Sequence, residues 1–91
     1  MKQIIRVLIA GASLAAVCWA SQAQAADPAF CQEYARRAVA QFERAAAQGC
    51  PVGGPRWTPN YDVHFGWCLT AAPWVAEREA HIRHERLEHC F

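Results

Sequence analysis

The chain has 91 residues, with nine basic and eight acidic side chains, five cysteines and 54% hydrophobic residues. Lys2 and Arg6 are two of the nine basic residues, so residues 26–91 carry seven arginines against eight acidic side chains, a formal charge of −1. That balance excludes the basic blocks that bind nucleic acid or anionic lipid. Residues 26–91 also contain no serine, lysine or methionine, which excludes a serine nucleophile, a Schiff-base lysine and a methionine metal ligand.

The N-terminal segment is typical of a secretory signal peptide. Its basic start is followed by an apolar run from Val7 to Ala20 and then by Ala23 and Ala25, which fit the small-x-small rule for signal peptidase. We therefore expect a cleaved signal peptide over residues 1–25 and a single exported domain over residues 26–91. The apolar run is shorter than the roughly 20 residues that a membrane span needs, so we expect no stable span after processing.

Two other interpretations of this segment stay open. It could be retained as an anchor helix, although its length argues against that role. It could instead carry a lipid on Cys18, although Val17 and Trp19 suit a lipid-attachment site poorly. In the favoured interpretation the product is periplasmic or secreted.

Four cysteines remain after residue 25, namely Cys31, Cys50, Cys68 and Cys90. An even number in an exported chain predicts two disulfides. A domain of this size has a thin core and usually depends on cross-links, each typically worth about 2–4 kcal/mol. Oxidised cysteines would also leave no thiolate to act as a nucleophile.

The first predicted element is a helix over residues 28–48. Asp27 is a good N-cap and Pro28 a good first helical residue, while Gly49 suits the C-terminal position. Between them, large and small apolar residues recur every four positions: Phe30, Tyr34, Ala38 and Phe42. This period and the many alanines favour a helix.

A loop and two further helices are predicted to follow. Residues 50–56 are rich in glycine and proline and indicate tight turns. Thr58 followed by proline repeats the cap-and-proline signal and predicts a short second helix of about three turns. A third helix is predicted to run from Pro73 to about Cys90, with charge-dense outer faces.

We therefore expect an all-α fold, a small disulfide-stapled bundle of two to three helices. Three helices with short connections favour an up-down-up course, which would bring Cys31 to Cys68 and Cys50 to Cys90. The nested pairing, Cys31 with Cys90 and Cys50 with Cys68, suits a two-helix hairpin and stays open, because sequence alone does not choose between pairings.

One segment combines residue types that favour recognition. Arg56, Trp57, Tyr61, His64 and Trp67 lie within twelve residues, and His64 and Trp67 are three apart, on one face of a helix. Exposed Trp and Tyr can stack on a sugar or anchor a protein interface, and arginine can pair with a carboxylate. The alternative is that the two tryptophans supply core mass, as large aromatics often do in tiny domains.

A second candidate lies on the third predicted helix. His81 and His84 are three residues apart and His81 and Glu85 four apart, spacings at which side chains can share Zn, Cu or Ni. The alternative is a solvated charged face, because Arg83 and Arg86 lie among these residues. No cofactor is predicted, since the chain has no CxxCH haem-attachment motif.

The cysteine and tryptophan spacing resembles a known family. The chain carries Cys-x2-Tyr-Ala-x2-Ala-Val-x-Gln from Cys31, Gly-Cys from Gly49, Gly-Pro-Arg-Trp from Gly54, His-x2-Trp-Cys from His64, and a final Cys90. This pattern resembles a small cysteine-rich domain of exported proteobacterial proteins that has no assigned activity. The resemblance covers nearly all of residues 26–91 and implies export and a disulfide-held helical fold, and it supplies no catalytic residues to carry over.

These observations together predict a non-enzymatic binding module of the bacterial envelope, with a protein or a glycan as its partner. The alternatives are a histidine-mediated metal-binding protein and a purely structural envelope protein. Asp62 and His64 do not form an acid–base pair for catalysis in this interpretation, because residues two apart on a helix point to different faces.

Overall fold

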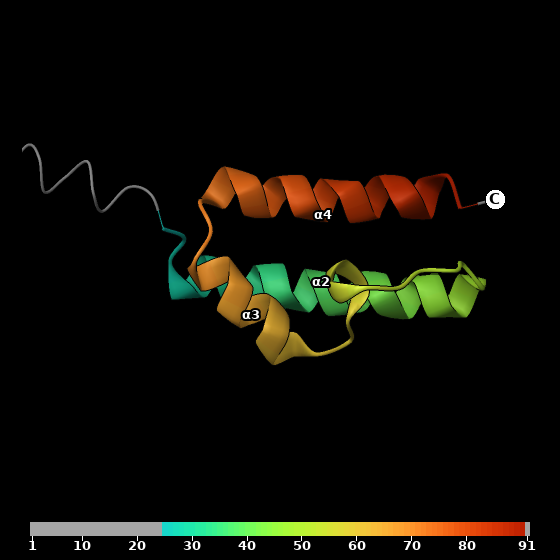
Figure 1. The fold of residues 1–91 in the computed structure, drawn as a ribbon, viewed down its shortest axis with the longest axis horizontal. Coiled ribbons are helices and arrows are strands. Elements are labelled where there is room, and N and C mark those ends of the chain that lie inside the picture. The colour runs from blue at the N-terminus through green and yellow to red at the C-terminus, as the bar shows by residue number, and fades with distance from the viewer. Residues whose placement is uncertain (1–24, 91) are drawn as a thin grey trace, which may run out of the picture.

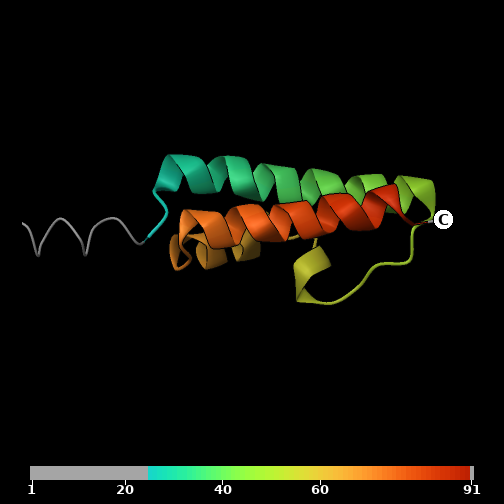
Figure 2. The same cartoon turned by 90° about the horizontal axis from the view of Figure 1, so that it is seen from above.

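The computed structural model describes residues 25–90, which form three α-helices and one short 3-10 helix, with no strand among them. In chain order these are α2 (Pro28–Gln48), η1 (Pro55–Trp57), α3 (Tyr61–Leu69) and α4 (Pro73–Glu88). α2 and α4 run in the same direction and α3 runs the opposite way (Figures 1 and 2). The predicted all-α class and up-down-up course are confirmed. The expected signal peptide lies outside the described residues except for Ala25.

α2 has the bounds that the sequence predicts, because both of its ends are set by local signals. The Asp27 carboxylate accepts a hydrogen bond from the Phe30 N–H at 2.9 Å, which satisfies one of the free donors of the first turn. Gly49 ends the helix in a left-handed conformation with φ of 70°. A residue without a Cβ adopts this conformation readily, so glycine suits the position.

α3 begins two residues later than the Thr58 signal indicates. Its N-cap is Asn60, whose side-chain oxygen accepts from the N–H groups of Asp62 and Val63 at 3.0 and 3.4 Å. The Thr58 hydroxyl instead accepts from the Asn60 N–H at 3.2 Å, so it braces the cap rather than forming it. The predicted start was wrong because asparagine is an equally good cap and stands next to the first apolar turn.

α4 ends at Glu88, close to the predicted end near Cys90. Its buried positions are Ala76, Ala80, Arg83 and Leu87, spaced three or four residues apart. Three of these side chains form the apolar face that packs inward, and the fourth is a charged residue. None of the helices described between residues 25 and 90 is long and apolar enough to cross a membrane.

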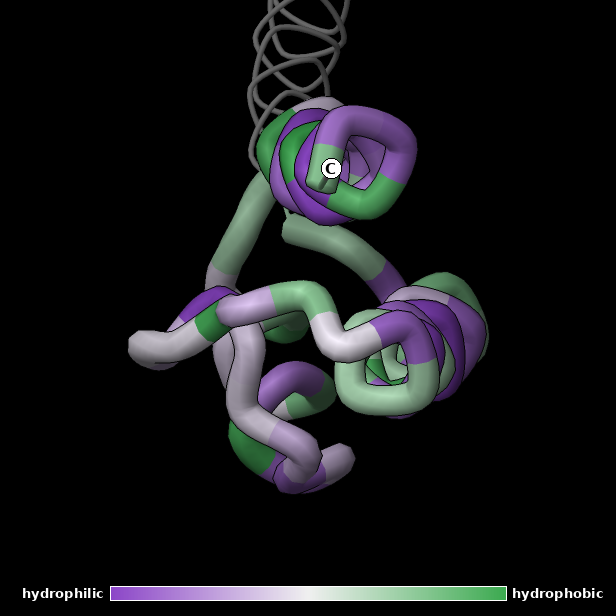
Figure 3. The backbone as a smooth tube through the Cα atoms, turned by 90° about the vertical axis from the view of Figure 1, so that its right-hand side faces the viewer, coloured by the Kyte–Doolittle hydropathy of each residue, from purple (hydrophilic) through white to green (hydrophobic). Residues whose placement is uncertain are grey.

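Two disulfides join the helices with the favoured pairing. Cys31 in α2 is bonded to Cys68 in α3, with their Cα atoms 5.5 Å apart, and Cys50 is bonded to Cys90 with Cα atoms 5.8 Å apart. The first bridge ties the start of α2 to the end of α3. The second ties the loop after α2 to the residues after α4. Figure 3 looks along the helices from the end at which α2 and α4 both finish.

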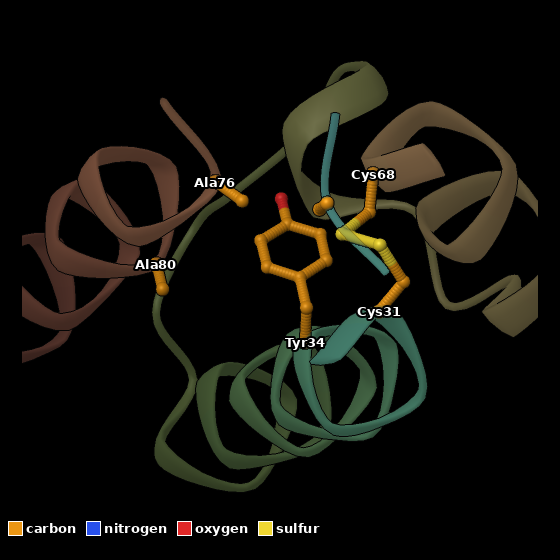
Figure 4. Packing of buried hydrophobic residues seen from close by; sticks show 6 residues of the cluster. Cys31, Tyr34, Cys68, Ala76 and Ala80 are labelled. Atoms are coloured by element: carbon orange, nitrogen blue, oxygen red, sulfur yellow. A yellow bond between two sulfur atoms is a disulfide. The ribbon is translucent and has the colours of Figure 1, made fainter. Parts of the chain in front are cut away.

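The core consists of two small clusters, one around each disulfide. Tyr34 fills the first cluster, where its ring lies between the Cys31–Cys68 bridge and two alanines of α4, Ala76 and Ala80 (Figure 4). The second cluster joins Ala45, Cys50, Trp57 and Leu87. Alanines supply much of the contact between the helices, and each cluster contains one large buried aromatic ring, Tyr34 in the first and Trp57 in the second.

Candidate functional site

Three of the five predicted binding residues meet at one cleft. Arg56, His64 and Trp67 line a hollow of about 520 Å³. The other two do not line it. Trp57 is 7% exposed and belongs to the second core cluster, while the Tyr61 ring stacks on Phe65, with ring centroids 6.0 Å apart. The core interpretation therefore holds for Trp57, whereas Trp67 is 39% exposed.

The cleft lies where α2, α3, α4 and the η1 loop meet. Its lining combines charged, aromatic and small residues: Tyr34, Gly53, Pro55, Arg56, Val63, His64, Trp67, Glu79 and Arg83. Each element contributes at least one side chain, so the cleft exists only in the folded chain. Gly54, beside this lining, has φ of 85°, a left-handed conformation that favours glycine and lets the loop turn sharply into η1.

An ion pair stands at one side of the cleft. Arg56 donates two hydrogen bonds to the Glu79 carboxylate, from Nε at 2.7 Å and from Nη2 at 3.2 Å. This side-on geometry is the strong bidentate form of an arginine–carboxylate pair. The hydrogen bonds from Arg56 hold the pKa of the Glu79 carboxyl below its ordinary value. Glu79 therefore stays ionised, and the two charges neutralise each other within the cleft.

His64 is a neutral hydrogen-bond donor in this fold. It is 4% exposed, and its Nε2–H donates to the Thr58 carbonyl oxygen at 2.7 Å. Burial lowers the pKa of His64, and the positive charge of Arg83 lowers it further. The bond from Nε2 places the imidazole proton there, which leaves Nδ1 as a hydrogen-bond acceptor.

Tyr34 and Arg83 form a buried network at the closed end of the cleft. Arg83 is 1% exposed, and its Nη1 donates to the Tyr34 hydroxyl oxygen at 3.2 Å. Its Nε donates to the Gln41 side-chain oxygen at 2.7 Å, and its guanidinium carbon lies 5.1 Å from the centre of the Tyr34 ring. Burial raises the pKa of Tyr34, so its hydroxyl keeps its proton.

The aromatic rings around Tyr34 join the two sides of the cleft. The Tyr34 and Trp67 ring centroids lie 5.5 Å apart, and the His64 ring meets the Tyr34 ring edge-on at 6.3 Å. Such offset and edge-on contacts are favourable geometries for aromatic pairs. They hold Trp67 at the mouth of the cleft, with part of its ring open to solvent.

The histidine-rich end of α4 is exposed, and its histidines stand beside glutamates. His81 lies 3.7 Å from Glu85, His84 3.8 Å from Glu88, and the His89 ring 3.4 Å from Glu85. In residues 25–90 no three His, Cys, Asp or Glu side chains are grouped so that they could hold a metal ion. We therefore base no function on His81, His84 and Glu85.

Four residues of the cleft lining were not among the predicted binding residues, namely Tyr34, Val63, Glu79 and Arg83. One signal could have found Arg83. It stands seven residues after Ala76 and four before Leu87, in register with the apolar face of α4. A charged residue in an otherwise apolar register indicates a buried charge with a specific use.

Comparison of the chain with family models, curated proteins and solved structures finds no match.

Proposed function

We propose that this chain is an exported, non-enzymatic binding module that works in the bacterial periplasm or outside the cell. Three features support this localisation: the signal-peptide pattern of residues 1–25, the two disulfides, and the resemblance to exported cysteine-rich domains. The partner is a glycan or a protein, and one sugar ring or side chain of it occupies the cleft.

The geometry around Ala26 is compatible with cleavage after Ala25. Ala26 is buried, and its N–H donates to the Ala71 carbonyl oxygen at 3.0 Å, at the turn between α3 and α4. An α-amino group created by cleavage at this point keeps hydrogen atoms to donate to that oxygen. Processing would therefore preserve the contact that anchors the start of the domain.

The observation that carries the binding proposal is the cleft itself. Its volume of about 520 Å³ lies within the range of small-ligand sites, roughly 300–1,000 Å³. A partly exposed Trp67 stands at its mouth, and Arg83 in its lining has a donor without a partner in residues 25–90. An aromatic face with a few convergent polar groups is the usual chemistry of recognition.

The chain offers a matched pair of variants to test this. Trp67 lines the cleft, whereas Trp74 is 67% exposed and does not line it. The 91-residue chain would be produced with export, and the ¹⁵N-labelled product titrated by NMR with a panel of oligosaccharides and peptides, one at a time. We expect a ligand that shifts the amide signals of cleft residues.

Trp67→Ala should lower the affinity for that ligand about 10-fold or more, as loss of an aromatic anchor does. Trp74→Ala should leave the affinity nearly unchanged. Equal losses from the two variants, or no panel member that perturbs the cleft, would contradict the proposal.

A further inference from the structure

Arg83 is a buried cation without a carboxylate partner. The side chain is 1% exposed, and its two hydrogen bonds go to the neutral groups of Gln41 and Tyr34. Its Nη2 is the buried side-chain atom in residues 25–90 that has no hydrogen-bond partner. A buried guanidinium is normally paired with an anion, because removal of its hydration is otherwise uncompensated.

The nearby carboxylate does not supply that anion. Glu79 lines the same cleft, but both of its oxygens accept from Arg56. With His64 neutral and Arg56 paired with Glu79, the lining carries a net positive charge, that of Arg83, although Glu79 lies close enough to feel it. An arginine with a purely structural role is stabilised by an acidic neighbour that accepts its hydrogen bonds. An arginine that binds a ligand needs a donor that no protein group has already taken.

Tyr34 provides a second free donor beside the first. Its hydroxyl oxygen accepts from Arg83 Nη1 at 3.2 Å, and within residues 25–90 its own O–H has no acceptor. Nη1 and Nη2 belong to one planar guanidinium, so the Tyr34 hydroxyl and the free Nη2 are both attached to the same charged group, one through a hydrogen bond to Nη1. Two such donors next to a positive charge suit the two oxygens of a carboxylate.

We propose that the cleft takes a small organic monocarboxylate, with its carboxylate on Arg83 Nη2 and the Tyr34 O–H and its apolar or ring-shaped body against Trp67. This inference rests on the proposed binding function and names its ligand class. The remaining lining fits such a body, since Val63 and Pro55 add apolar surface near the indole. Because Nη2 is buried in this structure, a carboxylate reaches it only when a lining side chain turns aside, and Trp67, which is 39% exposed, is the side chain at the mouth.

The test compares phenylacetate with phenylacetamide, which has the same body without the charge, by NMR titration of the exported chain. We expect phenylacetate to shift the signals of the cleft and to bind at least about 10-fold more tightly than the amide, as expected for a hydrogen bond to a charged group. Glucuronate and N-acetylphenylalanine then distinguish a sugar acid from a peptide C-terminus as the source, each against its own amide.

Variants locate the effect. Arg83→Met should abolish the preference for carboxylate over amide while leaving the Tm equal to or above that of the wild type, because it removes an unpaired buried charge. Tyr34→Phe should reduce the preference several-fold, and it tests the same geometry should Arg83→Met fail to fold. Arg36→Gln is the control, because Arg36 pairs with Glu33 on the exposed side of α2 and does not line the cleft.

The outcomes separate this inference from the binding function. Equal affinity for acid and amide, or equal loss of preference in Arg36→Gln, overturns the carboxylate site. If a neutral oligosaccharide or peptide occupies the cleft in place of any carboxylate, the ligand class is wrong and the binding function stands. If nothing occupies the cleft, both are wrong.

Discussion

At the scale of single residues, the cleft depends on titratable side chains that burial holds in one protonation state. His64 is the clearest case, because its burial and the charge of Arg83 disfavour protonation and together outweigh the hydrogen bond to the Thr58 carbonyl, which favours it. Protonation would place a second cation beside that guanidinium. The depressed pKa of His64 therefore expresses a free-energy cost of protonation in the folded state that the unfolded chain does not have.

This cost predicts a pH dependence of stability. The unfolded chain takes up a proton on His64 near the ordinary pKa of 6.5, whereas the folded chain takes it up at a lower pH. The free energy of unfolding should therefore decrease as the pH falls below about 6.5. The depressed pKa of Glu79 acts in the same direction, but only below its ordinary value of 4.5. The slope of stability against pH between 4.5 and 6.5 therefore tests His64 rather than Glu79.

Urea unfolding at several pH values between about 7.5 and 5 would measure this dependence. His64→Gln, which can still donate to Thr58, should flatten the slope. His84→Gln replaces an exposed histidine of α4 and should retain more of the slope. A slope that is unchanged in His64→Gln would show that His64 is not the group responsible.

At the scale of elements, the start of α3 sets the position of the cleft, since His64 and Trp67 both lie on that helix. Asn60 caps two N–H groups of the first turn, and Thr58 contacts only the cap residue. Asn60→Ala should therefore destabilise the chain by about 1 kcal/mol, the usual value of an N-cap. Thr58→Ala should cost less, and denaturant unfolding of both variants measures the difference. A larger loss of stability in Thr58→Ala than in Asn60→Ala would show that Thr58, and not Asn60, is the effective N-cap.

The elements also show how far sequence patterns reach. The bounds of α2 could be predicted because Asp27 and Gly49 act within one helical turn of its ends. Arg56, His64 and Trp67 could be singled out because they are crowded in one short segment. Arg83 and Tyr34 are 49 positions apart, and their hydrogen bond depends on the packing of α4 on α2. No local period encodes that contact, so the pairing of Arg83 with Tyr34 became visible only in the fold.

The same reasoning explains why the two tryptophans of the predicted segment have different roles. Trp57 lies in η1, which packs against the second disulfide cluster, and Trp67 lies in α3, whose outer face borders solvent. Composition predicts an aromatic-rich segment but does not say which ring is buried. The direction of the chain after Gly54 decides that, and it depends on the loop that the Cys50–Cys90 bridge holds.

At the scale of the whole molecule, the disulfides supply what a small alanine-rich core cannot. The bridges join residues 37 and 40 positions apart. Loops of that length are worth about 4 kcal/mol each by the chain-entropy account, while a whole small domain is stable by only about 5–15 kcal/mol. One bridge is therefore a large share of the total stability. Reduction should abolish the cooperative thermal transition and much of the helical circular dichroism, and a retained cooperative melt would contradict this.

Removal of one bridge at a time should affect the cleft unequally. Cys31–Cys68 lies in the cluster of Tyr34 and joins α2 to α3, which carry opposite sides of the cleft. Cys50–Cys90 lies in the other cluster, with Trp57 and Leu87. Cys31→Ala with Cys68→Ala should therefore shift the amide signals of cleft residues in native-state NMR at low temperature, while Cys50→Ala with Cys90→Ala should shift them less at a similar loss of stability. Equal shifts from both pairs would mean that the cleft depends on overall stability rather than on the bridge beside Tyr34.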